Sequence, residues 1–233
     1  MNLSYIIPVF NEKKTLDKSI QDIIDLPIEK EIIIVDNGST DGSIDIIKKY
    51  QNMDNFKIIF KSKNLGYGDS IQKGFDLATA KYIFIQYADL EYDHFSSMSM
   101  LNTALNDDLD AIFGSRLKDK KNFLNIILKK PSYLASIICT SLINFFYKKK
   151  FTDIIGTKLY KKKSIKKIMP KTKGQGFDFE LVSLICKHNL AVVESYVDYI
   201  PRTNSNEKKI KFYHMFNALY AIFKIKYFYI IKN

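Results

Sequence analysis

The chain has 233 residues, of which 46% are apolar and 26% are charged, so it can bury a folded core and is neither disordered nor collagen-like. Its 36 Lys and Arg against 25 Asp and Glu give a net charge of +11, which favours an anionic partner. The excess is concentrated in residues 118–173, which carry 16 lysines against two aspartates, whereas residues 1–117 are acidic. A uniformly basic nucleic-acid-binding protein is therefore not expected.

Short β-rich runs alternate with helical patterns through the first half of the chain. The runs are residues 3–9, 31–36, 56–61, 82–86 and 110–114. Between them, apolar residues recur at helical spacing, as from Leu16 to Ile24 before Pro27. This alternation predicts an α/β fold with a mostly parallel sheet flanked by helices on both faces. In such sheets, ligands bind at the carboxyl ends of the strands.

The pattern changes after Arg116, where a Lys-rich stretch begins. The elements expected beyond it are a helix at 132–147, a helix at 177–187, a strand at 191–197 and a terminal helix from about residue 210. The longest apolar stretch has 14 residues, which is short of the roughly 20 needed to span a bilayer. Cys139 and Cys186 lie in apolar runs and predict no disulfide framework, and a reducing cytoplasm is the expected location.

Polar and glycine-rich motifs follow the strands in an ordered series. They are Pro8-Val9-Phe10-Asn11-Glu12, Asp36-Asn37-Gly38-Ser39-Thr40-Asp41-Gly42, Asn64-Leu65-Gly66-Tyr67-Gly68 and Ala88-Asp89-Leu90-Glu91. In this order they resemble the nucleotide-sugar half of the inverting family-two glycosyltransferases, which have the GT-A fold, over roughly residues 3–116. A weaker continuation is similar to the subgroup that makes dolichyl- or undecaprenyl-phosphate sugars. It consists of Gly114-Ser115-Arg116, Asp153, Gly156-Thr157-Lys158-Leu159, Phe177-Asp178-Phe179-Glu180-Leu181 and Pro201-Arg202.

The resemblance implies one Rossmann-like GT-A domain over residues 1–233. Residues 1–116 would form the nucleotide-sugar half, 117–206 the Lys-rich acceptor half that faces a membrane, and 207–233 a C-terminal amphipathic helix. It also implies a nucleotide-sugar donor. The residues expected to bind that donor are Pro8, Asn11, Glu12, Asp36, Asn37, Asn64, Gly66, Tyr87 and Ala88. The alternative for residues 36–41 is a simple turn with a helix cap, because Asp, Asn, Gly and Ser favour both.

A diphosphate in an acidic site needs a hard cation, Mg²⁺ or Mn²⁺, to stabilise the leaving group. Asp89, which is also expected to be catalytic, and Glu91 are the candidate ligands, because residues at i and i+2 leave a strand on the same side. Surface acids after a strand are the alternative. In the family, the position of Tyr87 usually holds the first aspartate of an Asp-x-Asp motif, and Asn37 also replaces a usual aspartate.

The acceptor side of the site is expected to include Arg116 and Arg202, the two arginines in a chain that otherwise uses lysine. A guanidinium binds phosphate with two parallel hydrogen bonds, so both are candidates for phosphate or acceptor binding. A polyprenyl phosphate acceptor is already anionic and needs no base. A hydroxyl of a glycan or glycolipid needs a base, and Asp178 is then the first candidate. Asp153 and Glu180 are secondary candidates.

The run at 132–147 has a polar stripe of Ser132, Ser136, Thr140 and Asn144 opposite a wide apolar face, with lysines at both ends. This favours a helix lying at a membrane interface, and a buried core helix is the alternative. The expected protein is thus a metal-dependent glycosyltransferase bound peripherally to the cytoplasmic membrane face. Transfer to a glycan hydroxyl, or a non-catalytic nucleotide-sugar-binding homologue, is the competing interpretation.

Overall fold

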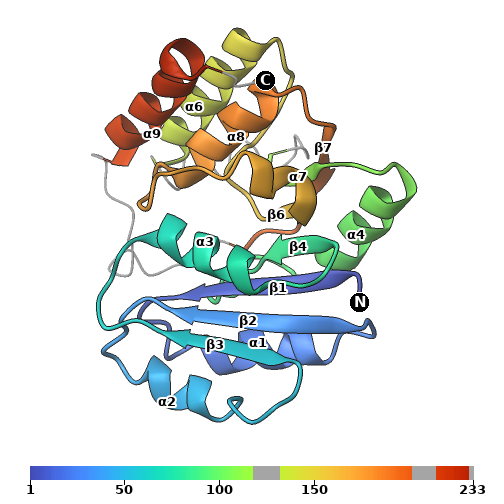
Figure 1. The fold of residues 1–233 in the computed structure, drawn as a ribbon, viewed down its shortest axis with the longest axis vertical. Coiled ribbons are helices and arrows are strands. Elements are labelled where there is room, and N and C mark those ends of the chain that lie inside the picture. Colours follow the sequence, from blue (N-terminus) through green and yellow to red (C-terminus); the bar gives the residue numbers. More distant parts are fainter. Residues whose placement is uncertain (118–131, 201–213, 231–233) are drawn as a thin grey trace.

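The computed structural model describes residues 1–117, 132–200 and 214–230, and within them seven strands form one sheet in the order β3-β2-β1-β4-β6-β5-β7 (Figure 1). The strands are β1 (Leu3–Val9), β2 (Lys30–Asp36), β3 (Phe56–Phe60), β4 (Tyr82–Ile85), β5 (Ala111–Ser115), β6 (Lys158–Lys161) and β7 (Val192–Tyr196). Neighbours are parallel except at β6, which runs antiparallel to β4 and β5. The mostly parallel α/β sheet expected from the sequence is confirmed.

Strand β6 and the short helix that follows it at residues 162–167 are elements that the sequence pattern does not predict. Strand β6 has only four residues with a lysine at each end, so the alternation that marks a strand is too short to recognise. It lies between β4 and β5 and thereby brings the second half of the chain into the sheet. A close approach of two backbones precedes it, because a Cβ on Gly156 would lie 1.8 Å from the carbonyl oxygen of Gly114.

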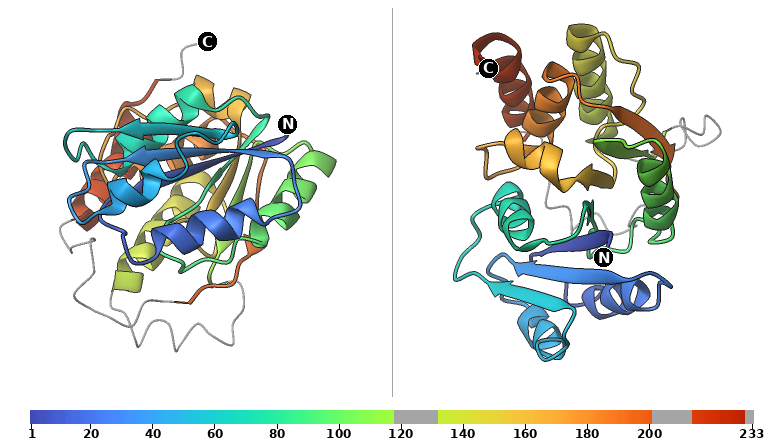
Figure 2. Two further views of the ribbon diagram at one scale, coloured as in Figure 1. Left: turned by 90° about the horizontal axis from the view of Figure 1, so that it is seen from below. Right: turned by 45° about the vertical axis from the view of Figure 1, so that its right-hand side comes forward.

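Helices cover both faces of the sheet, as expected (Figures 1 and 2). The helices packed on one face are α1 (Leu16–Ile24), α2 (Ser43–Lys48) and α4 (Ser96–Asn106). Those on the other face are α3 (Tyr67–Leu77), α6 (Ser132–Tyr147), α7 (Lys162–Lys167), α8 (Phe177–Lys187), α9 (His214–Phe223) and a π-helical turn (Lys224–Phe228). The terminal helix begins at residue 214 in the described part of the chain, and residues 210–213 lie outside it.

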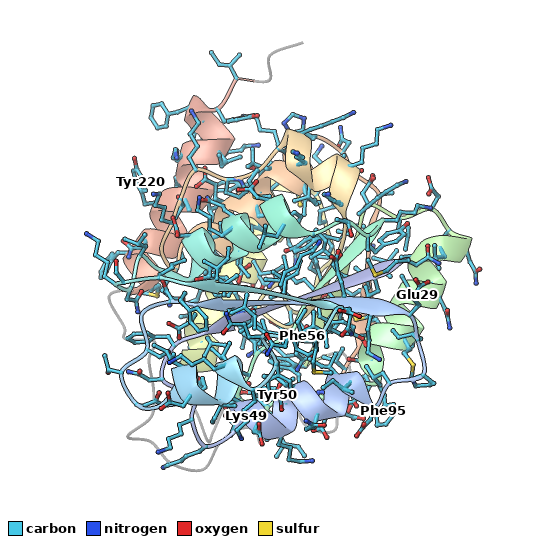
Figure 3. All side chains as sticks on the ribbon, turned by 60° about the horizontal axis from the view of Figure 1, so that its bottom comes forward. Glu29, Lys49, Tyr50, Phe56, Phe95 and Tyr220 are labelled. Carbon is cyan, nitrogen blue, oxygen red and sulfur yellow. The ribbon has the colours of Figure 1, made fainter. Side chains whose placement is uncertain are left out.

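Alternation along the strands supplies each face with its own core. In β1, Tyr5 and Ile7 join the core under α1 and α4, while Ile6 points to the core under α3. Each fully buried aliphatic side chain contributes about 1.5–3 kcal/mol relative to exposure. Beside α2, the rings of Tyr50 and Phe56 stack with centroids 5.3 Å apart (Figure 3).

The register of the parallel strands brings the loops that follow them to one edge. Val9, the last residue of β1, pairs with Asp36, the last residue of β2, and Asp36 pairs with Phe60 at the end of β3. Ile85 ends β4 opposite Ile6. The motifs that follow these strands therefore meet at the carboxyl edge of the sheet, where α/β folds bind ligands.

Candidate active site

The loops after β1 and β2 are tied together by side-chain to backbone hydrogen bonds. Asp36 is fully buried and its carboxylate accepts hydrogen bonds from the backbone N–H groups of Gly38 (3.0 Å) and Ser39 (3.1 Å). The N–H of Asn11 donates to Ser39 Oγ (2.9 Å), and Asn11 Oδ1 accepts from the N–H of Thr40 (2.8 Å). Asp36 thus does form the turn that the alternative interpretation assumed, and that turn lies against Asn11.

Glu12, Pro8 and Ala88 lie at the same edge. The N–H of Glu12 donates to Ser43 Oγ (2.9 Å), and its carboxylate accepts from the Thr15 hydroxyl (3.4 Å). Pro8 pairs in register with Val35 near the end of β2. Ala88 is buried at 3% exposure in the loop that follows β4. The donor residues expected from the first, second and fourth strands are therefore neighbours in space, and their contact with a donor stays a prediction.

Asn37 joins the loop after β2 to the loop after β3. Its Nδ2 donates to Asn64 Oδ1 (2.8 Å), and its Oδ1 accepts from Lys61 Nζ (3.3 Å) and from the N–H of Leu65 (3.0 Å). Asn64 Oδ1 also accepts from the N–H of Gly66 (2.8 Å). A carboxylate at position 37 could not donate to Asn64, which gives a physical reason for an amide in place of the usual aspartate.

Gly66 is the N-cap of α3, and its φ of 102° requires glycine. Its close neighbour is another segment of the chain, since a Cβ there would lie 2.4 Å from the carbonyl oxygen of Lys173. The same carbonyl accepts from the N–H of Asp69 (3.0 Å). Asp69 is buried between Lys61 Nζ (2.8 Å) and Lys173 Nζ (3.3 Å), whose charges lower its pKa against the effect of burial. The segment before α8 is thereby held over the start of α3.

Asp89 and Glu91 lie in a turn, so the argument from strand alternation is wrong. Strand β4 ends at Ile85, and Leu90 between the two carboxylates has a left-handed φ of 59°. Asp89 Oδ1 accepts from the N–H of Glu91 (3.2 Å), and Glu91 Oε2 accepts from the Tyr199 hydroxyl (2.8 Å). The two acids therefore lie in one turn, where the pleat of a strand does not set the directions of their side chains.

These two carboxylates suit a hard divalent cation, because both present oxygen ligands. Within the described ranges, no three His, Cys, Asp or Glu side chains come together as a metal-binding group. A cation held by Asp89 and Glu91 would therefore take its remaining ligands from donor oxygens and water. Metal binding by these residues stays a prediction.

Tyr87 lies at the centre of a partly buried cluster of aromatic and charged groups. Its hydroxyl is 3.1 Å from that of Tyr67, and the two rings stack at 6.1 Å. The Tyr67 ring makes an edge contact with Phe177, the neighbour of Asp178, and Asp178 Oδ2 lies 3.5 Å from Lys158 Nζ. Burial raises the pKa of both phenols, and the nearby Asp178 charge raises it further, so they remain protonated donors.

Asp178 is the buried carboxylate of this cluster. Burial raises its pKa above the ordinary aspartate value, although Lys158 and the Tyr67 hydroxyl act in the opposite direction. A raised pKa increases the affinity of a carboxylate for a proton, which suits a general base. The two other acids considered for this role have partners elsewhere: Glu180 binds Thr172 and Lys224, and Asp153 binds Arg116.

Arg116 is positioned by a bidentate ion pair. Its Nε lies 2.6 Å from Asp153 Oδ2 and its NH2 group 2.9 Å from Oδ1, while its guanidinium lies over the Tyr199 ring at 5.3 Å. Both charged side chains are buried, and Arg116 lowers the pKa of Asp153 against the effect of burial. The charges of the two residues act on the pKa of Tyr87 in opposite directions, since Arg116 lowers it and Asp153 raises it. Phosphate binding by Arg116 stays a prediction, and Arg202 lies outside the described residues.

Three residues of this site carry no role in the sequence interpretation: Tyr67, Lys61 and Lys158. Tyr67 lies inside the Asn64 to Gly68 motif and Lys158 inside the Gly156 to Leu159 motif, so both were within recognisable patterns. Lys61 follows β3 without a motif, and its buried contacts arise only from the folded loop. A lysine in a Lys-rich chain gives no sequence signal of burial.

The sequence matches the family described as Glycosyl transferase family 2 over residues 4–169. It is 36% identical over 111 residues to a cholesterol galactosyltransferase of Borreliella burgdorferi, covering 47% of this chain and 31% of that protein. It is 27% identical over 222 residues to a dolichyl-phosphate beta-glucosyltransferase of Dictyostelium discoideum, covering 84% of this chain and 66% of that protein. The chain thus spans less than two thirds of the length of either relative.

The fold is similar to that of a solved glucosyltransferase. Glucosyl-3-phosphoglycerate synthase from Mycobacterium tuberculosis, in complex with Mn²⁺, UDP-glucose and phosphoglyceric acid, superimposes with a TM-score of 0.67 at 11% identity. The match covers 96% of this chain and 79% of that one. The family match takes in β1 to α7, the part of the sheet that carries the strand-end loops. The chain belongs to glycosyl transferase family 2, with the GT-A architecture.

Proposed function

We propose that this chain transfers a sugar, with inversion, from a nucleoside diphosphate sugar to a polyprenyl phosphate at a membrane surface. The observation that carries the proposal is a line of packed side chains next to the carboxyl edge of a family-two sheet, which joins Arg116 to Tyr87 and to the start of α8. Its contacts are Arg116 over Tyr199, Tyr199 with Tyr92, Tyr92 with Tyr87, Tyr87 with Tyr67, and Tyr67 with Phe177, the neighbour of Asp178. The Dictyostelium relative that matches most of this chain is a dolichyl-phosphate transferase, which supports a lipid phosphate as the acceptor.

The donor is proposed to lie along the carboxyl edge of β1, β2 and β4. Asp36 and Asn11 shape the floor of the site, and the Asn37–Asn64 bridge holds the neighbouring loop. A divalent cation held at Asp89 and Glu91 would neutralise the departing diphosphate. Arg116, whose guanidinium is held in place by Asp153, would attract a phosphate group. An oxygen of the acceptor phosphate would attack the anomeric carbon on the side opposite the leaving group.

Helix α6 supports a membrane surface because its polar stripe faces the protein. Ser136 and Thr140 are buried, and Ser136 Oγ lies 3.4 Å from the Arg116 guanidinium. The opposite side exposes Leu134 (51%), Ile138 (50%) and Phe145 (80%). A helix with buried hydroxyls and an exposed apolar face is the reverse of the usual arrangement in water and is typical of an interfacial helix.

The C-terminal helix extends this apolar surface. Helix α9 packs beside α6 through the edge-on contact of Phe146 and Phe223 (Figure 1). Its outer side exposes Tyr220 (70%), which projects from the helix in Figure 3, and the following turn exposes Phe228 (82%). Aromatic side chains are favoured at the headgroup level of bilayers. Among the described residues, no helix is long and apolar enough to cross a membrane.

The test is nucleoside diphosphate release by the purified chain with UDP- and GDP-sugars, Mn²⁺ or Mg²⁺, and undecaprenyl phosphate in vesicles. We expect release that requires both the metal and the lipid. Binding to vesicles containing anionic lipid should fall in the Phe145→Ser and Phe228→Ser double variant. Phe95→Ser is the control and should leave binding unchanged, because Phe95 is 64% exposed on the opposite side of the sheet, at the start of α4. Turnover that ignores the lipid would reject this acceptor.

A sugar hydroxyl is the second candidate acceptor, and the buried Asp178 favours it. A hydroxyl nucleophile needs a base, and Asp178 has a raised pKa. Asp178→Asn separates the two acceptors. Transfer to a hydroxyl should fall by orders of magnitude, whereas transfer to a phosphate should change modestly.

A further inference from the structure

The segment that follows β7 lies against the turn that follows β4. Tyr92 and Tyr199 form an isolated antiparallel bridge, and the N–H of Ile200 donates to the carbonyl oxygen of Glu91 (2.9 Å). Glu91 and Tyr199 are 108 residues apart in the sequence. The backbone therefore holds Tyr199 beside the turn that contains Asp89 and Glu91, the proposed ligands of the cation.

The hydroxyl of Tyr199 is bonded to one of these carboxylates. It donates to Glu91 Oε2 at 2.8 Å, since an ionised carboxylate can only accept. Asp89 Oδ1 in turn accepts from the N–H of Glu91 (3.2 Å). Hydrogen bonds from neighbouring groups fix the orientation of carboxylates that bind metal ions and contribute to the affinity of the site. The phenol is thus placed to fix the orientation in which Glu91 meets a cation.

The ring of Tyr199 contacts the buried ion pair. The central carbon of the Arg116 guanidinium lies 5.3 Å from the ring centroid, within the range of cation–π attraction. Asp153 holds the same guanidinium with hydrogen bonds of 2.6 and 2.9 Å. The Tyr92 ring, with its centroid 5.0 Å away, packs against the Tyr199 ring and helps to fix its position. The two ends of one side chain therefore contact Glu91 and Arg116.

On the basis of the proposed function, we propose that Tyr199 is a positioning residue that couples the cation site to the arginine that attracts the acceptor phosphate. Its hydroxyl orients Glu91 for the cation that neutralises the departing diphosphate. Its ring holds the guanidinium of Arg116. The groups that act on the leaving group and on the acceptor are thereby held in a fixed relation by one side chain.

Nucleotide binding tests the contact with Glu91 without any turnover. The Kd of the full chain for UDP and for GDP is measured by calorimetry with EDTA and with saturating Mn²⁺. The ratio of the Kd in EDTA to the Kd in Mn²⁺ reports the contribution of the cation. Tyr199→Phe should lower this ratio about tenfold and leave the Kd in EDTA unchanged, because it removes only the hydroxyl that orients Glu91.

Tyr196→Phe is the matched control. The Tyr196 hydroxyl donates to Asp198 Oδ1 (2.8 Å), so the variant removes an equivalent phenol–carboxylate bond from the same segment. It should leave the ratio unchanged. Equal ratios for Tyr196→Phe and Tyr199→Phe overturn the proposal, and so does an unmodified chain whose nucleotide affinity is the same with Mn²⁺ and with EDTA.

Vesicle binding tests the contact with Arg116. Co-sedimentation is compared for anionic vesicles with and without undecaprenyl phosphate, so that the gain reports the lipid phosphate alone. Tyr199→Leu, which also removes the aromatic ring, should lose most of this gain, whereas Tyr199→Phe should keep it. Equal gains for the two variants overturn the coupling. If the unmodified chain releases no nucleoside diphosphate from any donor, the proposed function fails, and these two binding experiments still decide the role of Tyr199.

Discussion

Replacement of Asp153 by asparagine should destabilise the protein severely, because it leaves the Arg116 guanidinium buried without a counter-charge. The Asp153 side chain is fully buried and that of Arg116 is 8% exposed, and two charge-assisted hydrogen bonds of 2.6 and 2.9 Å join them. Removing one partner of a buried ion pair costs about 3–5 kcal/mol. For a chain of this size, that corresponds to a fall in melting temperature of about 6–20 °C.

The assay is urea unfolding and thermal melting of Asp153→Asn, with Lys18→Gln as the control. Lys18 and Asp22 form an exposed i,i+4 pair, whose loss should cost about 0.5 kcal/mol or less. Arg116 lowers the pKa of Asp153, so the pair stabilises the fold fully above the ordinary aspartate pKa and progressively less as the pH falls through the lowered value. A loss below about 1 kcal/mol at pH 7 for Asp153→Asn would refute the reasoning.

Three further predictions concern loops and core. Gly66→Ala should lower stability by more than 1 kcal/mol in urea unfolding, because its φ is 102° and the new methyl would meet the backbone of Lys173; an unchanged midpoint would contradict this. Asn37→Asp should weaken UDP or GDP binding about tenfold in calorimetry, because it replaces a donor to Asn64 by a second acceptor; unchanged affinity would show that the bridge does not shape the site. The hydrogen bonds of Glu31 and its ion pair with Lys57 outweigh burial and lower the pKa of its carboxyl to about 2. Glu31 therefore stabilises the fold above about pH 4.5 and loses that contribution as the pH falls towards 2, so Glu31→Gln should make the free energy of unfolding less dependent on pH in this range. An unaltered pH dependence would count against this prediction.

Much of the arrangement proposed to bind the donor follows from sequence. The loops after β1, β2 and β3 contain residue types that form turns, and these loops meet at the same edge of the sheet. Asp36, Asn11 and Asn64 are therefore brought together as expected. The arrangement of Asp89 and Glu91 could not be predicted from strand alternation, since the chain leaves β4 earlier and turns at Leu90.

The side of the site that is proposed to bind the acceptor depends on contacts between distant segments, which periodicity does not reveal. The polar stripe of α6 is visible in the sequence, but only the buried Arg116–Asp153 pair shows why Ser136 faces inward. Lys158 was also not predictable, because it is one lysine among many in its segment. It is buried because it lies in the four-residue strand β6, which places it beside Asp178.

The measurement that tests the central claim most directly is nucleoside diphosphate release from UDP- and GDP-sugars by the full chain, with Mn²⁺ or Mg²⁺ and undecaprenyl phosphate, compared with Asp89→Ala. The account predicts release that requires the cation and falls at least about a hundredfold in Asp89→Ala. Nucleotide binding without turnover, across every donor and with either cation, would contradict it and identify a binding protein that keeps the family fold without its chemistry.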